Sequence, residues 1–180
     1  MRPKPMPIHE ERLIAEAALG MPEALTELYE RFAPSLLGLA IRLTGSRSDG
    51  EDVLHDVFLG LPEALRHYQE RGALSSWLHR VIARVALTRM RIERRRRETS
   101  LTAENQDAAT PQPDAFESTA PLERLIRALP DRLRVVFVLK EIAGYSHREI
   151  ASLLGISTAA SEVRLCRAAK LLRSQLRNER

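Results

Sequence analysis

The chain has 180 residues, of which 44% are hydrophobic and 29% are charged, and its formal net charge is +4. This length and composition predict a globular protein with one ordinary domain or two small ones and exclude a chain that is disordered throughout. No stretch approaches the roughly 20 consecutive apolar residues that span a bilayer, so we expect a cytoplasmic protein without membrane insertion. The single cysteine, Cys166, excludes an intramolecular disulfide and a cysteine-rich metal site.

Charge is strongly segregated along the chain. Residues 1–79 carry a net charge of −4, residues 80–97 carry +7, residues 98–121 carry −5 and residues 122–180 carry +6. Clustered arginine is typical of proteins that bind the phosphate backbone of nucleic acids, although a solvated basic surface produces the same pattern. On charge alone, the two interpretations are equally supported.

A composition break in the middle of the chain predicts two domains. Residues 98–121 contain three prolines, no basic residue and no apolar periodicity, which is typical of a flexible linker. Both flanks show helical periodicity, and no alternating strand-like run of useful length occurs. We therefore expect an all-α protein with small helical domains over residues 1–97 and 122–180, joined by a flexible acidic linker.

The first domain opens with apolar residues at helical spacing between Leu25 and Leu43, and Pro34 predicts a break or kink among them. Residues 48–51, SDGE, then match a capping box, in which a serine and a glutamate satisfy the first amides of a helix. This pattern predicts a second helix that runs from there to about Leu61, where a proline follows.

One face of this second helix is acidic, and Leu59 lies in the middle of it. Leu59 either packs against a third helix, which the pattern alone slightly favours, or anchors a partner protein. In the second case the leucine supplies apolar burial and the acids supply orientation. The other residues on this face are Glu51, Asp52, His55 and Asp56.

A third long helix is predicted from Ser75 or Ser76 to about Arg97. Its apolar residues fill one wedge: Trp77, Leu78, Val81, Ile82, Val85 and Ile92. Four arginines gather on the other side: Arg80, Arg84, Arg91 and Arg94. Because almost no acidic residue interleaves with them, a salt-bridged surface is disfavoured and we expect these arginines to meet a polyanion.

After the linker, apolar periodicity predicts one helix that ends at Pro130 and another that ends at Gly144. Residues 146–149, SHRE, match a second capping box, Gly155 supplies a turn, and Ser157 can cap the next helix. This succession predicts a helix-turn-helix motif.

The last helix is amphipathic, with a basic face opposite the wedge that contains Leu165 and Leu172. The basic face suits DNA, and the alternative is a helical hairpin that merely exposes basic residues to solvent. Ser161 falls in the apolar wedge, where we expect its hydroxyl to bond a carbonyl one turn back.

Together these blocks resemble the extracytoplasmic-function sigma factors of the sigma-70 family, which pair a region two with a region four across a variable linker. The resemblance covers residues 20–97 and 122–177. Residues 52–59, DVLHDVFL, are similar to the helix that docks on the β′ clamp of RNA polymerase. The resemblance therefore favours the anchor interpretation of Leu59 and implies these polymerase-binding residues: Asp52, His55, Asp56 and Leu59.

Trp77 and the arginine run resemble the helix that captures and melts the downstream promoter element, and residues 63–74 correspond to the loop that holds a flipped base. Arg84 stands where asparagine is usual and Thr88 where aspartate is usual. The residues that the resemblance assigns to this DNA contact are Trp77, Arg80, Arg84, Arg91 and Arg94.

Residues 129–134, LPDRLR, and 146–167 resemble region four, which reads the upstream promoter element. The family's recognition helix usually reads S-x-x-T-V-K-S-R, whereas residues 157–164 read STAASEVR, with Glu162 in place of lysine. The implied DNA-binding residues are Ser157, Thr158, Ala159, Glu162, Arg164, Arg167 and Lys170.

The sequence thus favours a sigma factor, a binding protein without catalysis, whose implied partners are core RNA polymerase, duplex and melted promoter DNA, and often an anti-sigma protein. The alternative is a helix-turn-helix regulator that binds duplex DNA without polymerase, in which the first domain would instead serve dimerisation or ligand binding. Five scattered histidines and Cys166 make no convincing catalytic or metal site, so we expect no enzyme and no cofactor.

Overall fold

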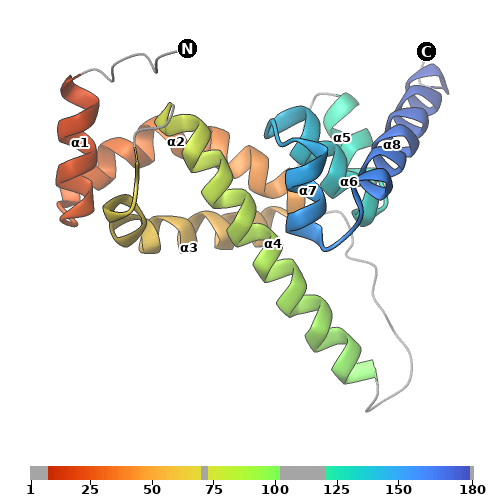
Figure 1. The fold of residues 1–180 in the computed structure, drawn as a ribbon, viewed down its shortest axis with the longest axis horizontal. Coiled ribbons are helices and arrows are strands. Elements are labelled where there is room, and N and C mark those ends of the chain that lie inside the picture. Colours follow the sequence, from red (N-terminus) through yellow and green to blue (C-terminus); the bar gives the residue numbers. More distant parts are fainter. Residues whose placement is uncertain (1–7, 70–72, 102–120, 179–180) are drawn as a thin grey trace.

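The computed structural model describes residues 8–69, 73–101 and 121–178, and every regular element within these residues is helical (Figure 1). The N-terminal part contains α1 (Ile8–Ala18), α2 (Pro22–Thr44), α3 (Arg47–Arg66) and α4 (Leu74–Leu101). The C-terminal part contains α5 (Pro121–Ala128), α6 (Asp131–Phe137), the π-helical turn η1 (Val138–Ile142), α7 (His147–Leu154) and α8 (Thr158–Asn178). The all-α prediction is confirmed, and no helix among the described residues could cross a membrane.

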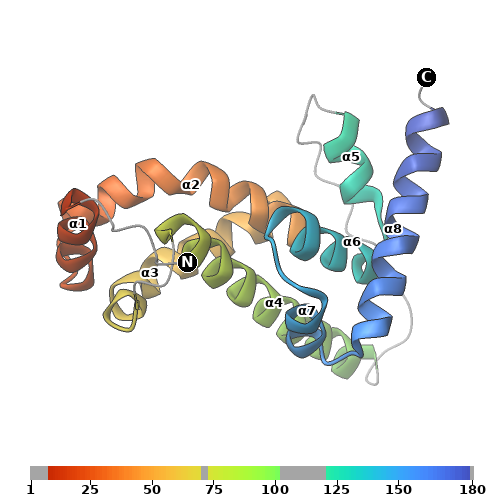
Figure 2. The ribbon, with the colours of Figure 1, turned by 45° about the horizontal axis from the view of Figure 1, so that its top comes forward.

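The first four helices form a bundle around α2, which packs against α3 and α4. Helix α1 packs against the C-terminal end of α3 (Figures 1 and 2). Fully buried leucines recur along α2 at Leu28, Leu36 and Leu43, and they meet Leu61 of α3 and Ile82 of α4 in one core. Burying a side chain of this size contributes roughly 1.5–3 kcal/mol, so the apolar stripe on each helix holds the bundle together.

Two prolines of the first domain lie inside helices: the expected break or kink at Pro34 produces no break, and the helix expected to end before Pro62 continues. Helix α2 runs through Pro34 to Thr44, and α3 runs through Pro62 to Arg66. A proline removes one helical hydrogen bond, but Pro34 lies on the exposed side of α2, where water can satisfy the freed carbonyl. The buried leucines on both sides of each proline therefore keep the helix continuous.

The start of α3 also differs from the prediction. The capping residue is Ser46, whose hydroxyl accepts a hydrogen bond of 3.3 Å from the amide of Asp49, and Ser48 lies inside the helix. The reason is Gly45, which ends α2 in the left-handed conformation with φ +84°. The chain reverses at this glycine, so the next residue, extended Ser46, is in place to cap α3.

The capping box of the second domain forms as predicted. The Ser146 hydroxyl accepts from the Glu149 amide at 3.2 Å, and the Glu149 carboxylate accepts from the Ser146 amide at 2.8 Å. Gly155 then adopts φ +65°, and the Ser157 hydroxyl accepts from the amide of Ala160 at 3.0 Å. Helices α7 and α8 therefore form the predicted helix-turn-helix.

Helix α4 is longer than predicted, because it continues past Arg97 to Leu101. Its last turns extend beyond the bundle (Figure 1). The rest of the expected linker, residues 102–120, lies outside the described residues.

Candidate nucleic-acid interface

The acidic side of α3 is exposed, and Leu59 is the most exposed apolar residue on it, with 68% of its surface accessible. Packing of Leu59 against a third helix, which the pattern alone favoured, is therefore not observed. Asp52, His55 and Asp56 are exposed on the same helix, while Val57 and its apolar neighbours face the core. The structure thus brings these four predicted residues to one accessible surface.

Arg89, a residue of α4 that the sequence patterns did not single out, holds two of these acids. Its guanidinium donates to Asp52 at 2.9 Å and to Asp56 at 2.6 Å. This fork orients both carboxylates and neutralises part of their charge. Arg89 lies beside the predicted arginine face, and its partners depend on how α4 crosses α3, which periodicity does not specify.

The four predicted arginines of α4 are exposed, opposite the buried Leu78 and Ile82: Arg80, Arg84, Arg91 and Arg94. Ile92, expected in the core wedge, is 48% exposed, because α4 has left the bundle by this point and no helix of the first domain covers it. The side chain of Thr88 donates to the carbonyl of Arg84 at 2.9 Å.

Trp77 lies at the beginning of α4 and is half-buried. Its ring contacts Tyr68 edge to face, with 5.1 Å between the ring centroids. An aromatic pair of this kind can hold a stacking surface in place for a base. Tyr68 belongs to the loop expected over residues 63–74, but residues 63–66 form the last turn of α3 and residue 74 begins α4, while residues 70–72 lie outside the described residues.

The predicted reading residues of α8 and of the turn before it are accessible. The exposed ones are Ser157, Thr158, Ala159, Glu162, Arg167 and Lys170, and Arg164 is half-buried. Ser161 is fully buried, but its hydroxyl does not bond a carbonyl one turn back as expected. It shares a hydrogen bond of 2.9 Å with Nδ1 of His147 at the start of α7.

The region of α7 lies next to the middle of α4 (Figures 1 and 2), and two hydrogen bonds join them. The hydroxyl of Tyr145 donates to the carbonyl of Arg80 at 3.3 Å, and the guanidinium of Arg91 donates to the carbonyl of Leu153 in α7. Burial raises the pKa of the Tyr145 hydroxyl above its usual value, and nearby Arg84 and Arg80 offset part of the rise.

Both halves of the chain match described families. Residues 28–96 match Sigma-70 region 2, and residues 119–172 match Sigma-70, region 4. The chain is 31% identical over 157 residues to the ECF RNA polymerase sigma factor SigE of Mycolicibacterium smegmatis, covering 83% of this chain and 60% of SigE. It is 29% identical over 163 residues to the RNA polymerase sigma factor CarQ of Myxococcus xanthus, covering 87% of this chain and 91% of CarQ.

Two solved structures share the fold. The sigma factor RpoE of Bartonella quintana, in complex with the anti-sigma factor NepR, superposes with a TM-score of 0.58 at 18% identity, covering 86% of this chain and 98% of RpoE. CnrH, in complex with the cytosolic domain of CnrY, superposes with a TM-score of 0.52 at 27% identity, covering 93% of this chain and 97% of CnrH.

Proposed function

The chain belongs to the sigma-70 family and is an alternative sigma factor of the extracytoplasmic-function group, and we propose that it binds core RNA polymerase through α3 and promoter DNA through α4 and α8. The surface for polymerase consists of Asp52, His55, Asp56 and Leu59. The exposed leucine supplies apolar burial, and the carboxylates, oriented by Arg89, direct the approach of a basic partner.

The downstream, or −10, element is assigned to the first domain. The Trp77–Tyr68 pair offers an aromatic edge for an unstacked base, and the four arginines are exposed further along α4. Stacking contributes about 1–3 kcal/mol per base, and the arginines neutralise phosphates. Together these contacts stabilise the melted strand relative to the duplex.

The upstream, or −35, element is assigned to the helix-turn-helix, with α8 in the major groove. Residues at the beginning of a recognition helix contact base edges, which assigns Thr158, Ala159 and Glu162 to the bases. Arg167 and Lys170, further along the exposed face, are assigned to phosphates. Glu162 is the one acid among these residues. The family's recognition helix usually has lysine at this position, so Glu162 distinguishes this surface from that of its relatives.

An anti-sigma domain is a further proposed partner. This rests on the fold shared with RpoE and CnrH, both solved as complexes. Because core polymerase and chromosomal DNA are its proposed targets, we place its action in the cytoplasm, and no catalytic step belongs to the proposal.

The observation that carries this proposal is the match of both domains, in order, to region 2 and region 4. The test is transcription with purified core polymerase on a genomic fragment library, with and without the full chain. We expect defined start sites only in the presence of the chain. Duplex binding without copurification of core polymerase would instead support the alternative, a helix-turn-helix regulator.

A further inference from the structure

We propose that the first half of α8 reads thymine methyl groups in the major groove through a stripe of small apolar side chains centred on Val163. The stripe consists of Ala159, Val163 and Cys166, and all three residues are exposed. This inference rests on the proposed placement of α8 in duplex DNA, and it adds the chemical feature that the helix recognises there. It assigns base contacts to Val163 and Cys166, which are not among the residues expected to contact DNA.

The stripe lies on one side of α8, away from the side that packs into the domain. Val163 follows Ala159 by four residues and precedes Cys166 by three, so the three side chains are neighbours on the helix surface. Val163 is 49% exposed, whereas Ala168 and Leu172 on the opposite side are buried. The three apolar residues therefore form a continuous exposed surface that is separate from the core.

The hydrogen bond between Ser161 and His147 determines which side of α8 faces outward. Ser161 is fully buried, and its hydroxyl lies 2.9 Å from Nδ1 of His147 in α7. Val163 comes two residues later, which is about 200° further around the helix. A buried polar group that loses its partner is costly, so this bond resists rotation of α8 about its axis and keeps the stripe pointing away from the domain.

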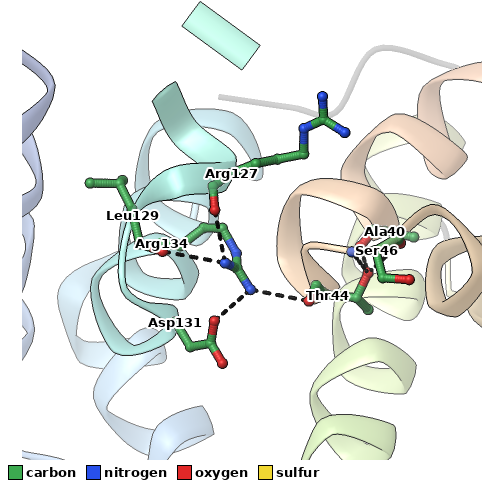
Figure 3. A network of polar contacts seen from close by, with 7 residues as sticks. All are labelled: Ala40, Thr44, Ser46, Arg127, Leu129, Asp131 and Arg134. Carbon is green, nitrogen blue, oxygen red and sulfur yellow. Dashed lines mark hydrogen bonds and ion pairs between the residues drawn. The ribbon is translucent and has the colours of Figure 1, made fainter. Parts of the chain in front are cut away.

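Helix α6 supports the buried side of α8. It is itself tied to the residues before it by Arg134, which is 5% exposed (Figure 3). The guanidinium donates to the carbonyls of Arg127 and Leu129 at 3.2 and 3.3 Å and pairs with Asp131 at 2.8 Å. The stripe is therefore carried by a helix on a well-bonded support, and base readout requires side chains that are held in place.

The chemistry of the stripe fits a thymine methyl group. In the major groove, thymine presents a C5-methyl group that cytosine lacks, and apolar side chains recognise this group by contact. Small side chains also allow the helix backbone to come close to the base edges. The hot spots of protein interfaces are instead enriched in Trp, Tyr and Arg, and no residue of the stripe is of these types.

Cations follow the stripe by one helical turn. Arg167 lies four residues after Val163, Lys170 lies four residues after Cys166, and both are exposed. Contacts of such cations with phosphates fix the register of a helix in the groove. The stripe is closer to the beginning of α8, in the part of a recognition helix that meets base edges. The usual pattern S-x-x-T-V-K-S-R has serine at the position of Val163, so the apolar contact distinguishes this chain from that pattern.

The test begins with selection of duplexes from a random library by the full chain, with and without purified core polymerase. In the selected element, each thymine is then replaced in turn by deoxyuridine, which keeps every hydrogen-bonding group and lacks only the methyl group. We expect at least one replacement to weaken binding of the parent chain about fourfold, the change that corresponds to burial of one methyl group. Val163→Ser should bind the thymine and uracil duplexes equally.

The matched control is Leu171→Ser, which removes another exposed apolar side chain of α8, outside the stripe. It should keep the full effect of uracil, and circular dichroism checks that both variants are folded. The proposal is overturned if uracil has no effect on the parent chain, or the same effect on the parent chain and Val163→Ser. Loss of polymerase binding by Val163→Ser, with the uracil effect unchanged, would assign the stripe to a protein partner instead.

The selection step separates this proposal from the proposed function. An element selected equally well without core polymerase would count against a sigma factor, while the uracil replacements would still test the stripe. An element selected only with core polymerase but insensitive to uracil would leave the proposed function standing and overturn the stripe. Selection of no element at all would overturn both.

Discussion

His147 and Ser161 share a hydrogen bond of 2.9 Å between imidazole Nδ1 and hydroxyl Oγ, and this bond joins the two helices of the helix-turn-helix. Ser161 is a fully buried residue of α8, at a position where helical spacing predicts an apolar side chain. The buried serine therefore has a polar partner in the histidine opposite it. We infer that the angle between α7 and α8 depends on both residues.

We expect Ser161→Val to destabilise the chain by about 1 kcal/mol, although it adds apolar volume to a buried position. The valine methyl would meet the His147 ring at hydrogen-bond distance, which is too close for carbon, and would leave Nδ1 unpaired. In a chain that carries His147→Ala, the same substitution should be stabilising, because both problems are gone. Denaturant unfolding of the four proteins measures this cycle, and the same sign in both backgrounds would show that the pair is uncoupled.

Leu59→Ala should weaken binding to core polymerase at least tenfold while the melting temperature stays within about 1 °C, because this leucine is exposed. The matched control is Leu61→Ala on the same helix. Leu61 is fully buried, so its loss should cost about 2–5 kcal/mol of stability. Interferometry with immobilised core polymerase measures the binding, and unfolding of Leu59→Ala would show that Leu59 belongs to the core.

Replacing the four arginines of the α4 face with alanine should flatten the salt dependence of promoter binding by the holoenzyme. Counterion release gives a slope of about 0.7 per phosphate contact for single strands and about 0.9 for duplex in the log–log plot. The residues are Arg80, Arg84, Arg91 and Arg94. The control removes the same charge from the other helices of the first domain, at Arg12, Arg31, Arg47 and Arg66. Equal slopes in the two variants would show that the arginines of α4 do not contact the DNA.

Glu162→Lys should tighten binding of the chain to all duplexes and reduce its preference for any one sequence. Glu162 is exposed early in α8, where its carboxylate repels phosphates. A salt-matched titration against the selected promoter element and a scrambled duplex measures both effects. Weaker binding to the selected element alone would identify Glu162 as a base reader that accepts from cytosine, with discrimination of about 1–3 kcal/mol.

Glu149→Gln should lower the thermal midpoint of the second domain at pH 7 but not at pH 3. Hydrogen bonds from the amide and hydroxyl of Ser146 hold the pKa of the Glu149 carboxyl below its usual value. Stabilisation by the charged form is therefore present above the unfolded pKa of about 4.3 and is lost as the pH falls through the lower folded value. Circular dichroism at both pH values tests this, with exposed Glu141→Gln as control. An equal effect at both pH values would contradict it.

Many local features of this protein could be predicted from its sequence, although Ser46 caps α3 in place of the expected Ser48. Helical periodicity placed the arginines of α4 on one side, and the order of Ser146, Glu149 and Gly155 predicted the helix-turn-helix, because caps and turns depend on residues only a few positions apart. The exposed acidic face of α3 followed from the same periodicity. The prediction that α3 would end before Pro62 was wrong, and Pro34 produces no break in α2, since burial of the flanking leucines outweighs one lost hydrogen bond.

The long-range pairs were decided by tertiary structure alone. Arg89 meets Asp52 across 37 residues, and Arg134 meets Thr44 across 90. Ser161 bonds His147 because α7 packs against α8 there, although its own helix offered a carbonyl. Each of these contacts requires two helices to cross at a particular angle and depth, and that geometry results from packing whole apolar faces together, which no local pattern specifies.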